Sequence, residues 1–228
     1  MDHHTVRYAD VEELPPQGAD ALSDSPRLFD HPLLDKLSRV HWSIPLVVYV
    51  PILAGLGLLS LKSLGLPTIG FAFLCGYGAW TLTEYFGHRY LFHSAFPGRL
   101  GARLHFLIHG VHHEHPNDPL RLVMPPLLSL PIMATAFLVI FTIDGGQPLA
   151  YPTAMGFLFG YLLYDMIHYY VHHAEPKTAL GRKLRRLHML HHFHDAERGF
   201  AISAPWWDSI FGTAHRPLTL SPRACPED

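Results

Sequence analysis

Residues 165–173 read Asp-Met-Ile-His-Tyr-Tyr-Val-His-His, which places His168 and His172 four residues apart in a stretch that is otherwise mostly apolar and aromatic. Residues four apart lie on one face of an α-helix, so the two imidazoles point to the same side. Imidazole is the commonest side-chain ligand of metals in proteins and suits iron, zinc, copper and nickel. This stretch therefore predicts a helix that presents histidine ligands to a metal ion.

Three further stretches, at 84–93, 109–113 and 188–192, also carry closely spaced histidines. The same helical spacing predicts that the histidines of each HxxHH cluster converge, which concerns His109, His112 and His113 in one cluster and His188, His191 and His192 in the other. Apart from His173, which adjoins His172, the four stretches supply ten histidines, more than a tetrahedral or octahedral ion can bind. Burying them without metal would strand polar groups at about 1–3 kcal/mol each. The pattern therefore favours a dimetal enzyme.

The composition excludes several other classes of protein. The chain has 228 residues, enough for one domain, with 16% charged and 49% hydrophobic residues and a net charge of −2. That charge gives no indication of nucleic-acid binding, and the sequence contains no phosphate-binding glycine loop. Its two cysteines, Cys75 and Cys225, lie outside the histidine clusters and cannot form a disulfide framework.

The apolar residues are gathered into four blocks, each about as long as the roughly 20 residues that cross a bilayer. The blocks lie at 41–61, 67–87, 122–143 and 151–171. Four buried helices of a soluble bundle are the alternative, but nearly all-apolar faces and short polar links favour membrane helices. We therefore predict an all-α integral membrane protein with four transmembrane helices and a cytosolic helical cap that holds a histidine-rich dimetal site. We expect a flexible polar leader at 1–30, the catalytic domain at 31–217 and a C-terminal tail at 218–228.

The distribution of basic residues predicts the orientation in the membrane. The link at 62–66 has one cation and the link at 144–150 has none, whereas most lysines and arginines lie between the second and third blocks and after the fourth. By the positive-inside rule, both termini and the central connection are cytoplasmic. Every histidine cluster then lies on the cytoplasmic side, as a single metal site requires.

Two acidic residues are candidates for orienting the metal ligands. Glu84 precedes His88 by four residues and Asp165 precedes His168 by three, so each shares a helical face with a histidine. A carboxylate that binds the second nitrogen of an imidazole holds the ring toward its metal. Helix capping and ordinary interface polarity are the alternative roles of these carboxylates.

Beyond the histidines, the segments 80–84, 105–110, 121–126, 164–165 and 198–213 make the chain resemble the membrane fatty acid hydroxylase/sterol desaturase superfamily, and most closely the fatty acid 2-hydroxylases. The likeness extends from about residue 29 to residue 213. It implies that the metal ligands are His88, His93, His109, His112, His113, His168, His172, His188, His191 and His192. His173 and His194 adjoin this set, and their roles stay open.

The resemblance implies a non-haem diiron membrane monooxygenase, whose sites can also be isolated with zinc. Its expected reaction is dioxygen-dependent hydroxylation at C2 of a long-chain fatty acyl group, free or in a sphingolipid such as ceramide. A sterol or other lipid hydroxylase or desaturase of the same superfamily is the alternative, and a membrane metal-binding or transport protein is a third reading. Many eukaryotic members carry a fused cytochrome b5-like domain, for which this sequence has no His-Pro-Gly-Gly motif. We therefore expect electrons from a separate redox protein, such as a cytochrome b5 or a ferredoxin with its reductase.

Overall fold

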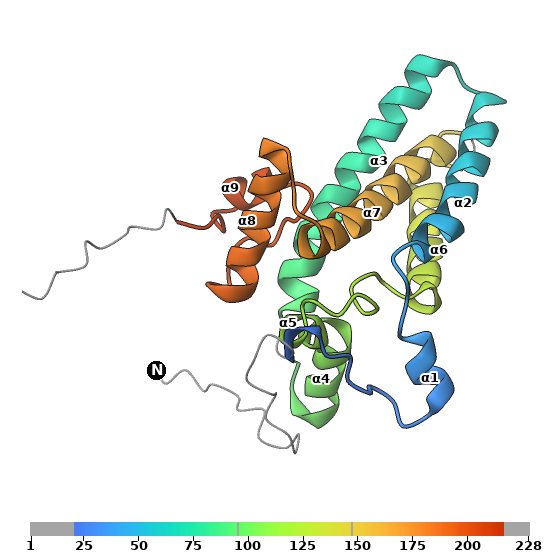
Figure 1. The fold of residues 1–228 in the computed structure, drawn as a ribbon. Coiled ribbons are helices and arrows are strands. Elements are labelled where there is room, and N and C mark those ends of the chain that lie inside the picture. The colour runs from blue at the N-terminus through green and yellow to red at the C-terminus, as the bar shows by residue number, and fades with distance from the viewer. Residues whose placement is uncertain (1–20, 95, 147, 217–228) are drawn as a thin grey trace, which may run out of the picture.

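The computed structural model describes residues 21–94, 96–146 and 148–216 of the chain. Within these ranges every regular element is a helix, which confirms the all-α prediction for this part of the chain (Figure 1). The predicted C-terminal tail and the first 20 residues of the predicted leader lie outside the described residues.

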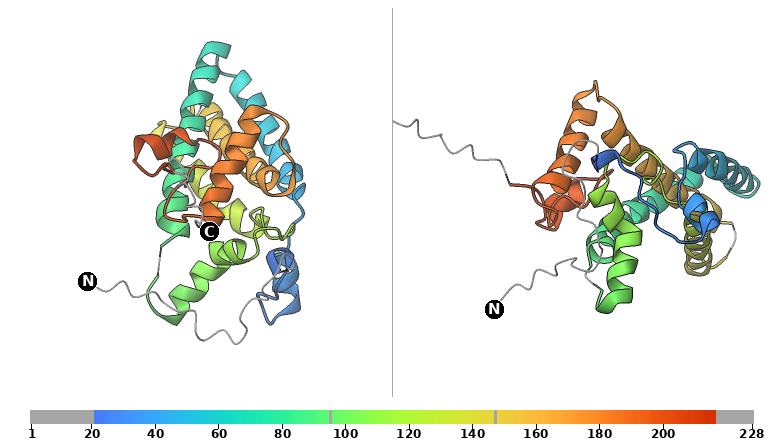
Figure 2. Two further views of the ribbon diagram at one scale, coloured as in Figure 1. Left: turned by 60° about the vertical axis from the view of Figure 1, so that its left-hand side comes forward. Right: turned by 60° about the horizontal axis from the view of Figure 1, so that its bottom comes forward.

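Four long helices form the body of the fold and coincide with the four apolar blocks. They are α2 (Ile44–Leu61), α3 (Leu66–Phe86), α6 (Pro126–Ile143) and α7 (Ala150–His173). Helices α3 and α7 make the most extensive contact, and α2 and α6 pack against α7 (Figures 1 and 2). The connections that follow α2 and α6 lie at one end of this bundle, and the C-terminal ends of α3 and α7 lie at the other (Figure 1). Helix α7 carries His168 and His172 near its end, and His88 lies just after the end of α3.

Two of the long helices, α2 and α6, are long and apolar enough to cross a membrane by length and composition. Helices α3 and α7 are less apolar, because they carry buried charged and histidine side chains. Glu84 is buried on α3, and Asp165, His168 and His172 are buried on α7. The central pair therefore carries the polar residues, while α2 and α6 present mostly apolar surfaces.

Glycines bring α3 and α7 into direct backbone contact. A Cβ atom on Gly76 would lie 1.9 Å from the carbonyl oxygen of Thr153, and one on Gly156 would lie 1.9 Å from that of Phe73. Small residues at a helix–helix contact allow this close approach. The packing fixes how α3 and α7 lie against each other and hence the relative positions of the histidines at their ends.

Shorter elements surround the C-terminal ends of α3 and α7. They are the π-helical turns η2 (Gly87–Phe92) and η3 (Phe106–Gly110) and the α-helices α4 (Gly98–His105), α5 (Val111–Glu114), α8 (Ala179–Phe193) and α9 (Trp206–Ile210), and we call them the cap. Helix α8 begins where the hydroxyl oxygen of Thr178 accepts a hydrogen bond of 3.1 Å from the backbone N–H of Gly181. In Figure 2, α8 (orange) follows α7 and runs back beside the C-terminal end of that helix.

The N-terminal part of the described chain is hydrogen-bonded to the loop that follows α5. This part contains the 3-10 turn η1 (Ala21–Ser23) and α1 (Pro32–Leu37). The backbone N–H of Asn117 donates to the carbonyl of Leu22 at 2.9 Å, and that of Val40 donates to the carbonyl of Leu120 at 2.6 Å. Residues 21–30, the end of the predicted leader, thus contact the polypeptide next to the second histidine cluster.

Asp35 is the acidic centre of this contact. Its carboxylate accepts a hydrogen bond of 2.8 Å from the backbone N–H of Leu28 and pairs with both Arg39 and Arg121 at 3.2 Å. The hydrogen bond from Leu28, together with the two guanidinium groups, lowers the pKa of Asp35 to about 2. The ionised carboxylate therefore joins the N-terminal segment to the loop after α5.

Candidate metal centre

The structure brings the ten histidines together in two groups of five, and within each group the candidate ligand atoms lie within 4.8 Å of one another. The first group is His88, His93, His109, His113 and His191, and the second group is His112, His168, His172, His188 and His192. Seven of the ten are buried, because the cap closes over them, and the other three, His93, His113 and His192, are half-buried. Both groups lie where the cap meets the ends of α3 and α7.

Each HxxHH cluster divides between the two groups. His109 and His113 belong to the first group, whereas His112 belongs to the second. The prediction that all the histidines of such a cluster converge on one point is therefore wrong, although His168 and His172 do share a group as predicted. Neighbouring positions differ by about 100° around a helix, so the adjacent histidines of an HxxHH cluster diverge while residues four apart stay together. The cluster at 188–192 divides in the same way.

His88 and His93 share the first group although five residues separate them. The chain forms the π-helical turn η2 here, and the backbone N–H of His93 donates to the carbonyl of His88 at 3.2 Å. A π-helical turn pairs residues five apart, and such turns occur frequently at functional sites. The widened turn brings together two side chains that a regular α-helix would separate.

The spacing of the nitrogen atoms fits a bound ion in each group. Neighbouring Nε2 atoms are 3.0–3.2 Å apart in the first group and 2.8–3.1 Å apart in the second. Two nitrogens each about 2.1 Å from one ion, and at right angles to each other, are separated by about 3.0 Å. The Nε2 atoms therefore lie at the distances expected between ligands of a common metal.

The protonation of two imidazoles also supports a bound metal ion in the first group. The Nδ1–H of His88 donates to the carbonyl of Phe200 at 2.6 Å, and that of His191 donates to the carbonyl of Arg198 at 2.8 Å. A neutral imidazole with a proton on Nδ1 has a bare lone pair on Nε2. The Nε2 atoms of His88 and His191 therefore carry no proton, and the five adjacent Nε2 atoms of the first group cannot all be paired by N–H···N hydrogen bonds. A bound cation would instead accept all five lone pairs.

Burial keeps the imidazoles in the form that binds metal. Removal from water, together with the charge repulsion of neighbouring histidines, lowers the pKa of His93 and of His113 to about 3. Removal from water is also the main cause that lowers the pKa of His191 to about 4. A low pKa means that the ring is neutral near pH 7 and offers its lone pair. This donor set of neutral nitrogens fits iron, zinc or copper and does not fit calcium or magnesium.

The two predicted carboxylates do not bind imidazole directly. Glu84 accepts hydrogen bonds from the backbone N–H groups of Ile202 at 2.8 Å and Ser203 at 2.7 Å, and from the Ser203 hydroxyl. Asp165 lies on α7, three residues before His168, and its carboxylate accepts from the backbone N–H of Met124 at 3.4 Å and from the Tyr161 hydroxyl at 3.3 Å. Glu84 thus contacts the segment that binds His88, and Asp165 joins α7 to the chain before α6.

Sequence reasoning missed the groups that hold His88 and His191. Both are backbone carbonyls of the segment 198–203, which Asp208 and Glu84 bind from the other side. No spacing rule identifies a carbonyl as a partner of histidine. The remaining candidates, His173 and His194, are exposed and lie outside both groups, and the ring of His173 rests against Tyr169.

Comparison with known proteins gives one family and several relatives. The family model described as "Fatty acid hydroxylase" matches residues 73–213, a range that contains all ten histidines. The dihydroceramide fatty acyl 2-hydroxylase FAH2 of Arabidopsis thaliana is 36% identical over 193 residues, covering 83% of this chain and 80% of that protein. The ceramide very long chain fatty acid hydroxylase SCS7 of Saccharomyces cerevisiae is 36% identical over 79% of this chain and 47% of its own length.

A solved structure has the same fold. It is full-length scs7p, of which the hydroxylase domain is visible, and it superposes with a TM-score of 0.75 at 35% sequence identity. The match covers 81% of this chain and 70% of that one.

Proposed function

The chain belongs to the fatty acid hydroxylase family, and we propose that it is an enzyme that hydroxylates a long-chain fatty acyl group at C2. The observation that carries this proposal is the pair of five-histidine groups inside the matched family region. The substrate class follows from the relatives, whose names specify dihydroceramide and ceramide acyl chains. We therefore propose an acyl chain in a sphingolipid of the ceramide type as the substrate, with the free fatty acid as the alternative.

We propose that the ten histidines bind two iron ions, five to each. Bound there, the irons would supply the oxidising power for the activation of dioxygen and the hydroxylation of a C–H bond. In the balanced reaction, one oxygen atom becomes the C2 hydroxyl group, and the other is reduced to water with two electrons and two protons. The chain's own contribution is to hold neutral nitrogens in place and to exclude water from them, as the burial of His109 and His112 indicates.

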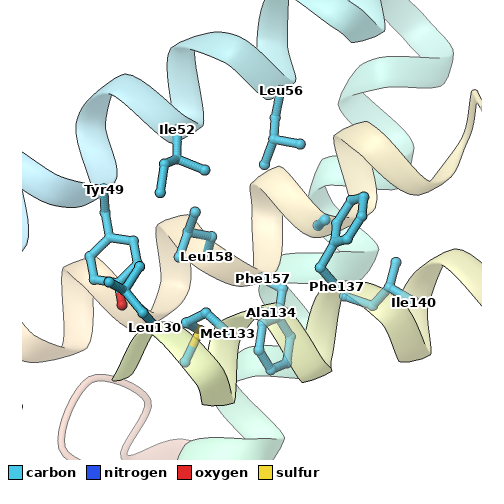
Figure 3. Close-up of a pocket in the computed structure, with 11 residues that line it drawn as sticks. Tyr49, Ile52, Leu56, Leu130, Met133, Ala134, Phe137, Ile140, Phe157 and Leu158 are labelled. Atoms are coloured by element: carbon cyan, nitrogen blue, oxygen red, sulfur yellow. The ribbon is translucent and has the colours of Figure 1, made fainter. Parts of the chain in front are cut away.

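An apolar cavity between α2, α6 and α7 supports the choice of a long acyl chain (Figure 3). Its volume is about 320 Å³, and its lining includes Ile52, Phe137, Ala154 and Leu158. Leu158 precedes the histidine His168 by ten residues, which is about 15 Å along an α-helix. We propose that the cavity receives the distal part of the acyl chain while C2 lies at the metals.

The proposed topology has four spans with both termini and both histidine groups in the cytoplasm. Its support is the position of the four long helices on the four apolar blocks, together with the asymmetry of basic residues. Reporter fusions after Leu64, Gly98, Gly146 and Pro222 test it. Fusions after Leu64 and Gly146 should report the outer side and the other two the inner side, and an outward report at Gly98 would contradict the topology.

We propose that the two electrons come from a separate redox protein, such as a cytochrome b5 or a ferredoxin with its reductase. Helix α8 supports this proposal because it exposes Arg182, Lys183 and Arg186 on the helix that also carries His188 and His191. A positively charged face attracts an acidic partner. We retain residues 31–217 as the proposed catalytic domain, preceded by the leader at 1–30.

Isotope labelling tests the reaction. Cells that express the chain should accumulate 2-hydroxy acyl lipids, and heavy dioxygen, but not heavy water, should label the new hydroxyl. His191→Ala should abolish this product because it removes one nitrogen of the first group. Label from water would exclude an oxygenase, and a new double bond without added oxygen would favour the desaturase alternative. Separate analysis of ceramides and free fatty acids identifies the form of the substrate.

A further inference from the structure

The segment 198–203 is bound on both of its sides, by histidines on one and by acidic residues on the other. The carbonyls of Arg198 and Phe200 accept from the Nδ1–H groups of His191 and His88. Asp208 accepts from the backbone N–H groups of Phe200 at 2.9 Å and Ala201 at 3.0 Å. The segment therefore transmits the position of Asp208 to the first histidine group.

One peptide unit of this segment joins a carboxylate to a metal-binding imidazole. The carbonyl of Phe200 and the N–H of Ala201 belong to the same planar peptide group. The carbonyl accepts from His88 Nδ1–H at 2.6 Å, and the N–H donates to Asp208 Oδ2 at 3.0 Å. Hydrogen bonds in such a chain polarise one another, so the carboxylate makes the carbonyl a stronger acceptor for the imidazole N–H.

The corresponding chain at His191 ends without a charge. The carbonyl of Arg198 shares its peptide group with the N–H of Gly199, which donates to the carbonyl of Thr213 at 2.9 Å. Gly199 has a φ of +75°, in the left-handed region that glycine adopts without strain. The backbone turns here, and the carbonyls on either side of this residue both reach histidines of the first group.

The second group has no such anchorage among the described residues. The Nδ1 atoms of His172, His188 and His192 are buried without a hydrogen-bonding partner from the described part of the chain. Carboxylate and carbonyl partners of metal-binding histidines fix the ring and raise its basicity. The two groups therefore differ in how firmly the protein holds their imidazoles.

We propose that Asp208 is a positioning residue of the first metal site and acts on His88 through the peptide group between Phe200 and Ala201. It is buried and serves three donors, the two backbone N–H groups and the Thr213 hydroxyl at 2.8 Å. Burial raises the pKa of Asp208, and these three donors oppose that effect by stabilising the carboxylate. Glu84 supports the same arrangement by binding the next two N–H groups of the segment.

The inference rests on the proposed dimetal centre, and metal release tests it without measuring catalysis. The full-length protein is purified in detergent, loaded anaerobically with iron(II), and its iron content per chain is measured. A coloured iron(II) chelator then records the release of each equivalent. Asp208→Asn should accelerate the release of one equivalent by about 10–100-fold, the usual effect of removing such a partner, and should leave the other unchanged.

The matched control is Thr213→Val, which removes a donor to Asp208 Oδ1 but leaves the bond from Ala201 to Oδ2. It should change the release rate much less than Asp208→Asn. Equal effects of the two variants, acceleration of both iron equivalents, or loss of the fold in metal-free Asp208→Asn protein would each overturn the proposal. The iron content of the wild-type protein tests the dimetal centre itself. A wrong dimetal assignment is therefore distinguishable from a wrong role for Asp208.

Discussion

The imidazole rings of His113 and His192 stack, with centroids 4.3 Å apart and planes inclined by 27°, although the two residues belong to different histidine groups. They extend from α5 and α8, and each of these helices contributes to both groups. The stack therefore places the two candidate metal sites side by side. Two ions in adjacent sites could both act on one small substrate molecule, whereas two distant ions could not.

Substitution of a single histidine should remove metal selectively. Wild-type protein prepared with ample iron should contain two metal ions per chain, and His172→Ala should lower this ratio toward one because His172 belongs to the second group alone. Elemental analysis of the purified proteins measures the ratio. The control is His173→Ala, which alters the exposed neighbour outside both groups and should leave the ratio at the wild-type value. A wild-type ratio of one, unaffected by His172→Ala, would refute the dimetal assignment.

The contact between α3 and α7 should tolerate no side chain at its glycines. Gly156→Ala would place a methyl group against the backbone of Phe73, and such overpacking typically costs about 1–3 kcal/mol. Thermal unfolding in detergent should show a lower midpoint. Gly70→Ala is the matched control on α3, because a Cβ there meets no atom within 4 Å. A midpoint for Gly156→Ala as high as that for Gly70→Ala would show that the two backbones are not in contact.

The cavity of Figure 3 should set the preferred length of the acyl chain. Ala154→Phe adds a ring at a buried lining position and should shift the 2-hydroxy products toward shorter chains. Phe137→Ala enlarges the same cavity and should shift them toward longer chains. Mass spectrometry of the products from a mixture of chain lengths measures both shifts. Unchanged distributions in both variants would place the acyl chain elsewhere.

Acid should weaken the contact between the N-terminal segment and the loop after α5. The pKa of Asp35 in the folded protein is about 2, below its ordinary value of 3.8. The contribution of its carboxylate to stability is therefore complete above pH 3.8 and is lost as the pH falls through about 2. The midpoint of thermal unfolding of wild-type protein should therefore exceed that of Asp35→Asn at pH 7, and the gap should narrow below about pH 4. A gap that is independent of pH would show that the charge on Asp35 is not what stabilises the contact.

The sequence was sufficient to predict the helices because hydrophobic blocks and histidine spacing are local properties. The four apolar blocks coincide with α2, α3, α6 and α7, and pairs four residues apart, such as His168 and His172, do share a group. The apolarity of α3 and α7 was harder to judge. Their apolar side chains are interrupted by glycines and buried polar groups, whose purpose is visible only once the helices are packed together.

The division of the histidines between two groups was not predictable from spacing alone. His112 lies in a different group from the pair His109 and His113, and its partners come from other helices. In the same way, His191 lies in a different group from His188 and His192. The π-helical turn at His88 also lies beyond α-helical periodicity. The bond between Asp208 and the 200–201 peptide depends on backbone groups, which every residue carries and no motif distinguishes.

The contribution of α8 to both histidine groups has a consequence for biosynthesis. His191 completes the first group, and His188 and His192 complete the second, yet they follow the first ligand by about 100 positions in the chain. A nascent chain that has been translated only through α7 carries four histidines of the first group and three of the second. If the two groups bind the proposed pair of irons, complete loading would wait until the ribosome has passed residue 192, after the hydrophobic helices have been synthesised.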